Sequence, residues 1–225
     1  MKRYALYAVP GVDETDAAEA LQLKAVVDAW FAREDLRDLT VDARRYGFHA
    51  TLVAPFYLAA AHTEVELVAA VESFSSGRTP VTIPGLRPAA LGGFRVLRPS
   101  GDQTSLNALA ASVVRQFDDF RAPLGEADVR RRCVDRLTSR QRDLFDRWGY
   151  PYVLDEFHFH LTLTDALTAD RAAAVDAAAV QHFAGVAGID VPLSGITISV
   201  QPEPGAAFEI LAVSPFAPAL VLETT

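Results

Sequence analysis

Two short stretches, each with a histidine and a threonine separated by one residue, hold the side chains best suited to chemistry. Residues 46–52 read Tyr-Gly-Phe-His-Ala-Thr-Leu, and residues 157–163 read Phe-His-Phe-His-Leu-Thr-Leu. An imidazole can act as an acid or a base near neutral pH, and a hydroxyl can donate a hydrogen bond to an anionic oxygen. If both stretches face one cleft, His49 and His160 could form an acid/base pair while Thr51 and Thr162 hold an anion, in particular a phosphate.

The alternation of residue types within both stretches predicts β-strands, over residues 46–58 and 156–164. Successive side chains of a strand point to opposite faces, so each histidine shares a face with its threonine while the bulky apolar residues share the other. A single pattern of this kind is typical of an ordinary surface strand. Its recurrence favours a shared site, because burying unpaired imidazoles and hydroxyls would cost free energy.

Four further side chains near the two stretches are candidates for substrate contacts: Tyr46, Tyr150, Tyr152 and His158. The tyrosines could stack on a sugar or a base, and ordinary packing explains them equally well. His158 shares the strand face of His160, so it could contact an anion, or the two histidines could bind a metal ion. Metal sites usually need three protein ligands, and the first stretch offers no second ligand. We therefore expect neither a metal nor a cofactor.

Charge and composition exclude several classes of protein. Half of the 225 residues are hydrophobic and 22% are charged, as in folded globular proteins. The formal net charge of -8 argues against a protein that binds long nucleic acids, because such proteins neutralise phosphates with lysine and arginine. Seven arginines nevertheless fall between residues 129 and 148. They could clamp a phosphate, or they could form a solvated helix face.

Cysteine usage and apolar stretches bear on location. Cys133 is the only cysteine, so no internal disulfide can form. The apolar run at the N-terminus stops at Pro10, which is too short for a secretory signal, and no uncharged apolar run is long enough to span a membrane. We therefore expect a cytoplasmic protein with no membrane partner.

Helical and strand-like periodicities are mixed along the chain and predict an α+β fold. We expect strands at residues 3–9, in the two histidine stretches, as an antiparallel pair over 80–88 and 89–99, and as a hairpin of 196–200 with 208–213. We expect helices from a cap at Asp13 or Thr15 to about 34, at 63–74 and 105–120, from a cap at Thr138 or Ser139, and from 168 to about 185. No strong linker is present, so residues 1–225 should form one compact unit of two similar lobes facing each other across a cleft.

The paired stretches resemble the His-x-Thr-x motifs of the two-histidine (2H) phosphoesterase superfamily, which lie roughly 110 residues apart. Residues 45–52 (Arg-Tyr-Gly-Phe-His-Ala-Thr-Leu), 148–152 (Trp-Gly-Tyr-Pro-Tyr) and 159–164 (Phe-His-Leu-Thr-Leu-Thr) look like the DUF1045 branch, often labelled as phosphonate metabolism proteins. Residues 3–7 and 120–124 fit the same branch. The resemblance covers nearly the whole chain.

The superfamily implies a bilobal fold of two pseudo-twofold-related lobes, each of mainly antiparallel sheet flanked by helices, with the active site between them. It also implies metal-independent cleavage or transfer at phosphodiesters, commonly cyclic ones, with His49 and His160 as the catalytic pair and Thr51 and Thr162 as the phosphate-binding residues. The two motifs are equivalent, so they do not tell the base from the acid. Where the family carries a basic residue this chain has Val53 or His158, which could weaken its anion contacts.

We therefore expect a phosphodiesterase that hydrolyses a small cyclic phosphate of a sugar or nucleotide. Its partner would be this small phosphorylated substrate. Two alternatives stay open: a non-catalytic binder of a phosphorylated metabolite, and a metal-dependent hydrolase that uses His158 and His160.

Overall fold

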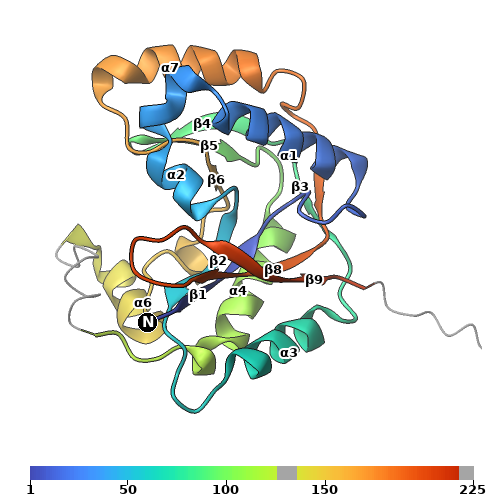
Figure 1. The fold of residues 1–225 in the computed structure, drawn as a ribbon, viewed down its shortest axis with the longest axis vertical. Coiled ribbons are helices and arrows are strands. Elements are labelled where there is room, and N and C mark those ends of the chain that lie inside the picture. Colours follow the sequence, from blue (N-terminus) through green and yellow to red (C-terminus); the bar gives the residue numbers. More distant parts are fainter. Residues whose placement is uncertain (126–135, 218–225) are drawn as a thin grey trace, which may run out of the picture.

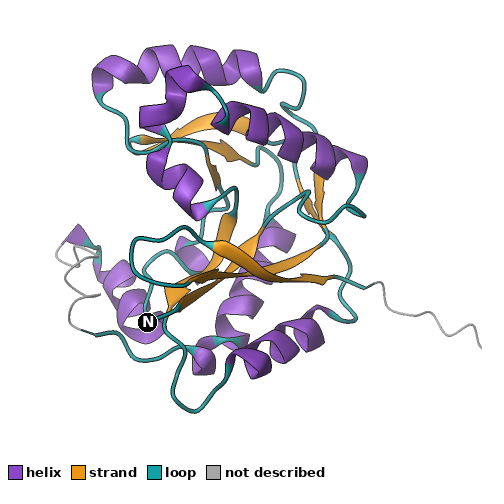
Figure 2. Cartoon of the chain, viewed as in Figure 1, coloured by secondary structure: helices purple, strands orange, loops and turns teal. Residues whose placement is uncertain are grey.

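Antiparallel sheets form the framework of the computed structural model, which describes residues 1–125 and 136–217 (Figure 2). The largest sheet has the strand order β2-β1-β8-β9 and contains β1 (Arg3–Ala8), β2 (Ala50–Phe56), β8 (Gly195–Gln201) and β9 (Glu209–Pro215). A second sheet has the order β4-β5-β6 and contains β4 (Arg87–Leu91), β5 (Phe94–Arg98) and β6 (Leu161–Thr162). A third, small sheet pairs β3 (Val81–Ile83) with β7 (Val191–Leu193). The α+β class with antiparallel sheets is confirmed.

Helices lie around the two larger sheets (Figure 1). Beside the three-stranded sheet lie α1 (Ala18–Phe31), α2 (Val41–Tyr46) and α7 (Ala169–His182). Beside the four-stranded sheet lie α3 (Glu64–Ser75), α4 (Thr104–Gln116) and α6 (Ser139–Trp148). Short 3₁₀ helices are η1 (Glu34–Leu39), η2 (Asp118–Phe120) and η4 (Leu154–Glu156).

Local sequence explains where several helices begin. Capping boxes, in which the first side chain and the one three residues later satisfy each other's backbone N–H groups, open α3 at Thr63 and α6 at Thr138. The predicted cap of α1 is wrong. Ala17 precedes that helix without a side-chain cap, and Asp13 instead accepts hydrogen bonds from Thr15 in the loop before it.

Each of the two larger sheets is covered in part by helices that belong, along the chain, to the other sheet. The segment with α1 and α2 connects β1 to β2 but packs against the second histidine stretch, where Trp30 Nε1 donates to the carbonyl of Leu163 at 3.0 Å. In return, the segment with α4 and α6 connects β5 to β6 but packs on β2. There Val114, Leu144 and Val153 form a cluster with Val53. Each of the two larger sheets therefore depends in part on helices from the other connection for its cover.

The structure corrects both predicted histidine strands. Tyr46 is the last residue of α2, and β2 starts only at Ala50, because Gly47 turns the chain with a positive φ of 78°. In the second stretch only Leu161 and Thr162 pair with β5, so the strand predicted over 156–164 shrinks to two residues. The first residue of the predicted strand, Glu156, is the last residue of the 3₁₀ helix η4, which begins at the left-handed residue Leu154 (φ 55°).

The strand pair predicted over 80–99 is also partly wrong. Gly85, with a φ of 56°, divides the first segment into β3 and β4. Only β4 pairs with β5, through the turn at Gly92 and Gly93, whereas β3 pairs with β7 far along the chain. The hairpin predicted at the end of the chain is confirmed as β8 and β9.

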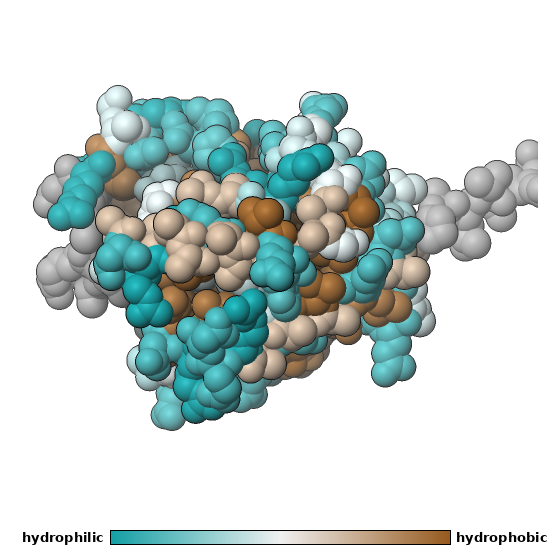
Figure 3. Space-filling model, turned by 90° about the horizontal axis from the view of Figure 1, so that it is seen from above, coloured by the Kyte–Doolittle hydropathy of each residue, from teal (hydrophilic) through white to brown (hydrophobic). Residues whose placement is uncertain are grey.

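The outer surface over α7 and α1 mixes hydrophilic and apolar residues (Figure 3). Val180 of α7, for example, is 64% exposed. Within residues 1–125 and 136–217, we find no helix with the length and apolar character needed to cross a membrane.

Candidate active site

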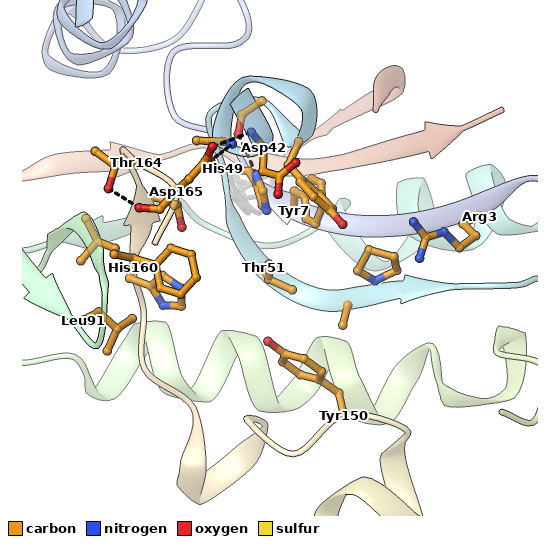
Figure 4. A pocket seen from close by; sticks show the side chains of 18 residues that line it. Arg3, Tyr7, Asp42, His49, Thr51, Leu91, Tyr150, His160, Thr164 and Asp165 are labelled. Atoms are coloured by element: carbon orange, nitrogen blue, oxygen red, sulfur yellow. Dashed lines mark hydrogen bonds between the residues drawn. The ribbon is translucent and has the colours of Figure 1, made fainter. Parts of the chain in front are cut away.

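A cavity of about 470 Å³ brings the two histidine stretches together. Its lining includes His49 and Thr51 from the first stretch and His160 and Thr162 from the second (Figure 4). Tyr46 and Tyr150, two of the predicted substrate contacts, line it as well. The folding that joins two segments so far apart in the sequence therefore assembles both imidazoles and both hydroxyls in one space.

The first histidine is positioned by the turn between α2 and β2. Gly47 has φ 78° and ψ 174°, a combination that is essentially restricted to glycine. Its carbonyl accepts a hydrogen bond from His49 Nδ1 at 2.9 Å. Phe48 and Leu52 are buried on the opposite face of the chain, so the histidine and Thr51 are directed into the cavity.

The second histidine is held in the same way without a glycine. His160 Nδ1 donates to the carbonyl of His158 at 2.7 Å, again two residues earlier in the chain. Thr162 lies opposite Val96 of β5 and lines the cavity. Thr164 also lines it, but its hydroxyl already donates to the carbonyl of Asp165 and accepts from the backbone N–H of Arg95.

These two hydrogen bonds fix the tautomer of both imidazoles. A carbonyl can only accept, so the proton of each neutral ring resides on Nδ1 and the lone pair of Nε2 is available. The hydroxyls of Thr51 and Thr162 have no hydrogen-bond partner within the described part of the chain. The site thus offers two bases and two free hydroxyl donors.

The surroundings of the two rings differ. His49 stacks on Tyr7 of β1, with ring centroids 3.7 Å apart and planes tilted by 25°. Burial is the largest cause that lowers the pKa of His49, to about 4; the charge of His160 lowers it further and the Gly47 carbonyl opposes the change. Burial also lowers the pKa of His160, assisted by Arg98 and His158. Both shifts favour neutral rings in the free protein.

Tyr7 and Arg3 line the cavity too, and we did not single them out from the sequence. Both belong to β1 and lie four residues apart, so they share one face of that strand. The alternation Arg-Tyr-Ala-Leu-Tyr of residues 3–7 contains this signal, but nothing in the sequence places β1 beside β2.

The carboxylates at the cavity wall are already paired. Asp165 accepts the backbone N–H groups of Asp42 and Ala43 at 3.1 and 2.9 Å, where α2 begins. Asp42 forms an ion pair with Arg45 at 2.8 Å. Their negative charge is therefore compensated locally, and Asp165 joins the second histidine stretch to the segment that precedes the first.

A family model described as "Protein of unknown function (DUF1045)" matches residues 51–209. The chain belongs to the DUF1045 family. This confirms the branch to which the sequence resemblance pointed.

Two curated relatives are substantially longer than this DUF1045 chain. A protein of Janthinobacterium sp. (strain Marseille) named ribose 1,5-bisphosphate phosphokinase PhnN is 36% identical, over 92% of this chain and 49% of its own length. A protein of the same name from Laribacter hongkongensis (strain HLHK9) is 35% identical, over 83% of this chain and 42% of its own. The chain thus spans about half the length of the curated relatives it matches.

A solved structure shares the fold of the DUF1045 chain. The crystal structure of TT0787 of Thermus thermophilus aligns with a TM-score of 0.51 at 14% identity, covering 96% of this chain and 98% of TT0787. The likeness confirms the predicted fold.

Two predicted contacts of the DUF1045 site lie outside the main cavity. His158 and Tyr152 line a neighbouring hollow of about 370 Å³, together with Phe94, Tyr150 and others. His158 is exposed, and its backbone carbonyl accepts the hydrogen bond from His160 Nδ1. Tyr152, 46% exposed, packs its ring against Tyr150 in a T-shaped contact at 5.6 Å.

Within residues 1–125 and 136–217, no three His, Cys, Asp or Glu side chains lie close enough together to hold a metal ion. The pair His158 and His160 therefore finds no third protein ligand there. Of the arginine-rich segment, Arg140 forms an ion pair with Asp155 and Arg147 with Asp118, and neither lines the cavity. Arg130, Arg131, Arg132 and Cys133 lie outside the described residues.

Proposed function

We propose that this DUF1045 protein is a metal-independent phosphodiesterase that hydrolyses a small cyclic phosphate by paired-histidine acid/base catalysis. One observation supports this above all. Both imidazoles donate through Nδ1 to the carbonyl two residues earlier, so both Nε2 atoms are available in a cavity that also holds two unpartnered hydroxyls. Two imidazoles can supply the base and the acid for cleavage of a phosphodiester, and the hydroxyls can donate to its non-bridging oxygens.

In the proposed reaction, one histidine removes a proton from water as the water attacks phosphorus. The other, protonated when substrate is bound, donates a proton to the departing sugar oxygen, so that a cyclic diester and water give an open monoester. Thr51 and Thr162 donate hydrogen bonds to the non-bridging oxygens. We assign the base to His49, because its neutral form is favoured by the deeper burial of its ring.

The names of the curated relatives suggest phosphorylated ribose as the class of substrate, in keeping with the phosphonate label of the branch. The kinase activity in those names is not proposed for this chain. A P-loop kinase needs a Gly-Lys pair at the end of its phosphate-binding loop. The sequence contains two lysines, Lys2 and Lys24, which follow a methionine and a leucine.

Phosphorus NMR tests the proposal directly. Purified protein is incubated with 2′,3′-cyclic nucleotides and ribose cyclic phosphates, with His49→Asn as the control. We expect the cyclic signal of at least one compound to be replaced by a monoester signal, in the presence of a chelator and only with the unaltered protein. Tight binding of phosphorylated metabolites without any ring opening would instead support a binding protein, and loss of turnover with the chelator would support a metal hydrolase.

A further inference from the structure

One wall of the cavity carries a cation that the acid/base scheme does not use. Arg3 lines the cavity but is only 7% exposed. Its Nε and Nη2 both donate to the side-chain oxygen of Gln201, which is a neutral partner. Its Nη1 makes no hydrogen bond, and the guanidinium forms no ion pair, within the residues that the structure describes. Because a guanidinium stays charged, a nearly buried positive charge is left without a counter-ion.

A second unsatisfied group lies on the same strand face. Tyr7 is 1% exposed, lines the same cavity, and its hydroxyl has no hydrogen-bond partner in the described part of the chain. Burial raises the pKa of Tyr7, so the hydroxyl stays protonated, while the charge of Arg3 acts in the opposite direction. A buried hydroxyl without a partner costs free energy, which a ligand oxygen would recover.

The two carboxylates that line the cavity have partners other than Arg3. Asp42 is paired with Arg45, and Asp165 with backbone N–H groups, so neither is left to neutralise Arg3. The ring centroid of Phe208 lies 5.8 Å from the guanidinium carbon, and the same ring contacts Tyr7, so Arg3 faces an apolar group on one side, which strengthens the electrostatic effect of its charge. In Figure 4, Arg3 lies at the opposite end of the pocket from His160, with Tyr7 and Thr51 between them.

We infer that Arg3 and Tyr7 form a subsite for a second anionic group of the substrate, a phosphate monoester. The two N–H groups of Arg3 Nη1 suit the terminal oxygens of a monoester. Along β1, Arg3 lies four residues, about 13 Å of strand, from Tyr7, which lies opposite Thr51, so Arg3 is the far end of this subsite and Tyr7 is the end nearer the histidines. The second group therefore lies across the body of the substrate from the phosphate between the histidines. The inference rests on the proposed function for the identity of that first phosphate.

A binding experiment tests the subsite without any turnover. Ribose 5-phosphate, a monoester with no cyclic phosphate, is titrated calorimetrically into the protein, with ribose as the uncharged comparison. We expect Arg3→Gln to raise the Kd for ribose 5-phosphate by about 10- to 100-fold, as expected on losing a charged donor. Arg78→Gln is the matched control. It removes the same charge from a residue that stacks on Phe74, away from the cavity, and should leave the Kd unchanged.

Two more variants guard against a merely structural effect of Arg3. Tyr7→Phe removes one hydroxyl and keeps the ring that stacks on His49, and it should weaken binding about threefold to tenfold. Arg3→Lys should recover part of the affinity because it restores the charge. Unchanged affinity in both Arg3→Gln and Tyr7→Phe, or no binding by the unaltered protein, would overturn the subsite. Loss of binding in His49→Asn alone would place the monoester between the histidines and overturn it as well.

A turnover experiment separates this inference from the proposed function. Adenosine 2′,3′-cyclic phosphate is compared with the same compound carrying a 5′-phosphate. We expect the 5′-phosphorylated compound to have the higher kcat/KM, and Arg3→Gln to reduce the ratio of the two values toward one. Equal kcat/KM values in the unaltered protein would overturn the subsite while the phosphodiesterase stands. If neither compound is hydrolysed the phosphodiesterase is in doubt, and the ribose 5-phosphate titration still decides on the subsite.

Discussion

The two histidine stretches reach the same local geometry by different routes. In the first, a glycine-only turn after α2 presents the carbonyl that accepts from His49, and the ring rests on Tyr7. In the second, the carbonyl belongs to His158, in the segment between η4 and the two-residue strand β6. The shared feature is the hydrogen bond from Nδ1, which leaves Nε2 available in both rings. What matters for the chemistry is therefore this hydrogen bond, whereas the surrounding secondary structure is free to differ.

The surroundings of the two rings also give them different pKa shifts. The pKa of His49 falls to about 4, chiefly through burial, beside an aromatic ring at 3.7 Å. Burial is also the largest cause that lowers the pKa of His160, with smaller lowering effects from Arg98 and His158, and the neighbouring hollow adjoins this ring. A ring that strongly prefers the neutral form suits a base. Equal motifs in the sequence thus become unequal partners in the structure.

The largest expected effect tests whether both copies are needed. His49→Asn and His160→Asn should each lower kcat for a confirmed cyclic phosphate by about 10³-fold or more, because each removes one of two coupled proton transfers. Single-turnover assays on both variants measure this, with circular dichroism to verify the fold. Near-normal turnover by either variant would exclude the paired mechanism, and a large loss in one copy alone would show that the other histidine only binds.

Removal of either threonine hydroxyl should lower activity less than removal of a histidine, and by a similar factor in both copies. Thr51→Val and Thr162→Val keep the shape of the side chain and remove the hydroxyl, so each should lower kcat/KM by about 10- to 100-fold. Steady-state assays of both variants provide the measurement. Thr164→Val is a useful comparison, because that hydroxyl already bonds within the protein. A loss of activity in Thr164→Val but not in Thr162→Val would contradict the assignment of Thr162 as a phosphate-binding residue.

The accepting carbonyl belongs to Gly47 in the first copy and to His158 in the second, and substitution of these two residues should have different effects on kcat. Gly47→Ala meets no atom within 4 Å but forces an alanine into a glycine-only conformation, so we expect the His49 carbonyl contact to shift and kcat to fall about tenfold. His158→Ala keeps its carbonyl and should change kcat less than about threefold, because the exposed ring lies outside the main cavity. The same kinetic assay covers both. The reverse order of effects would show that the His158 ring acts on the substrate.

The pH dependence should reflect the burial of both rings. In the free protein the base must be neutral and the acid protonated, and both pKa values lie below the ordinary histidine value of 6.5. The bell-shaped profile of kcat/KM should therefore be centred below pH 6.5, and the profile of kcat at higher pH, because a bound phosphate favours protonated histidine. Initial rates from pH 4 to 9 give both profiles. A kcat/KM optimum above pH 7 would contradict the description of two desolvated imidazoles.

The sequence predicts features that depend on neighbouring residues better than features that depend on contacts between distant residues. The alternation of Phe48, His49, Ala50 and Thr51 is local, so it placed the histidine and threonine on one face correctly. The pairing of β3 with β7 and the exchange of helices between the sheets depend on contacts far apart in the sequence, which periodicity does not report. For the same reason, the sequence did not predict that Arg3 and Tyr7 line the cavity. Tyr7 comes to lie opposite Thr51, and Arg3 opposite Gln201, only because β1 pairs with both β2 and β8.

The smallest expected effect is on the pH dependence of the unfolding free energy, which should differ between the variants of the two histidines. Between pH 6.5 and about 4 the unfolded chain protonates His49 while the folded protein does not, so the unfolding free energy falls as the pH drops through this window. Since the ring is partly exposed, we expect His49 to account for roughly 1–3 kcal/mol of that fall. Urea unfolding at pH 7, 6 and 5 should therefore show a flatter pH dependence for His49→Asn than for His160→Asn, with His62→Asn, outside the cavity, as the control. Parallel curves for His49→Asn and the unaltered protein would mean that His49 is as easily protonated in the fold as in water, and the two copies would then be electrostatically alike.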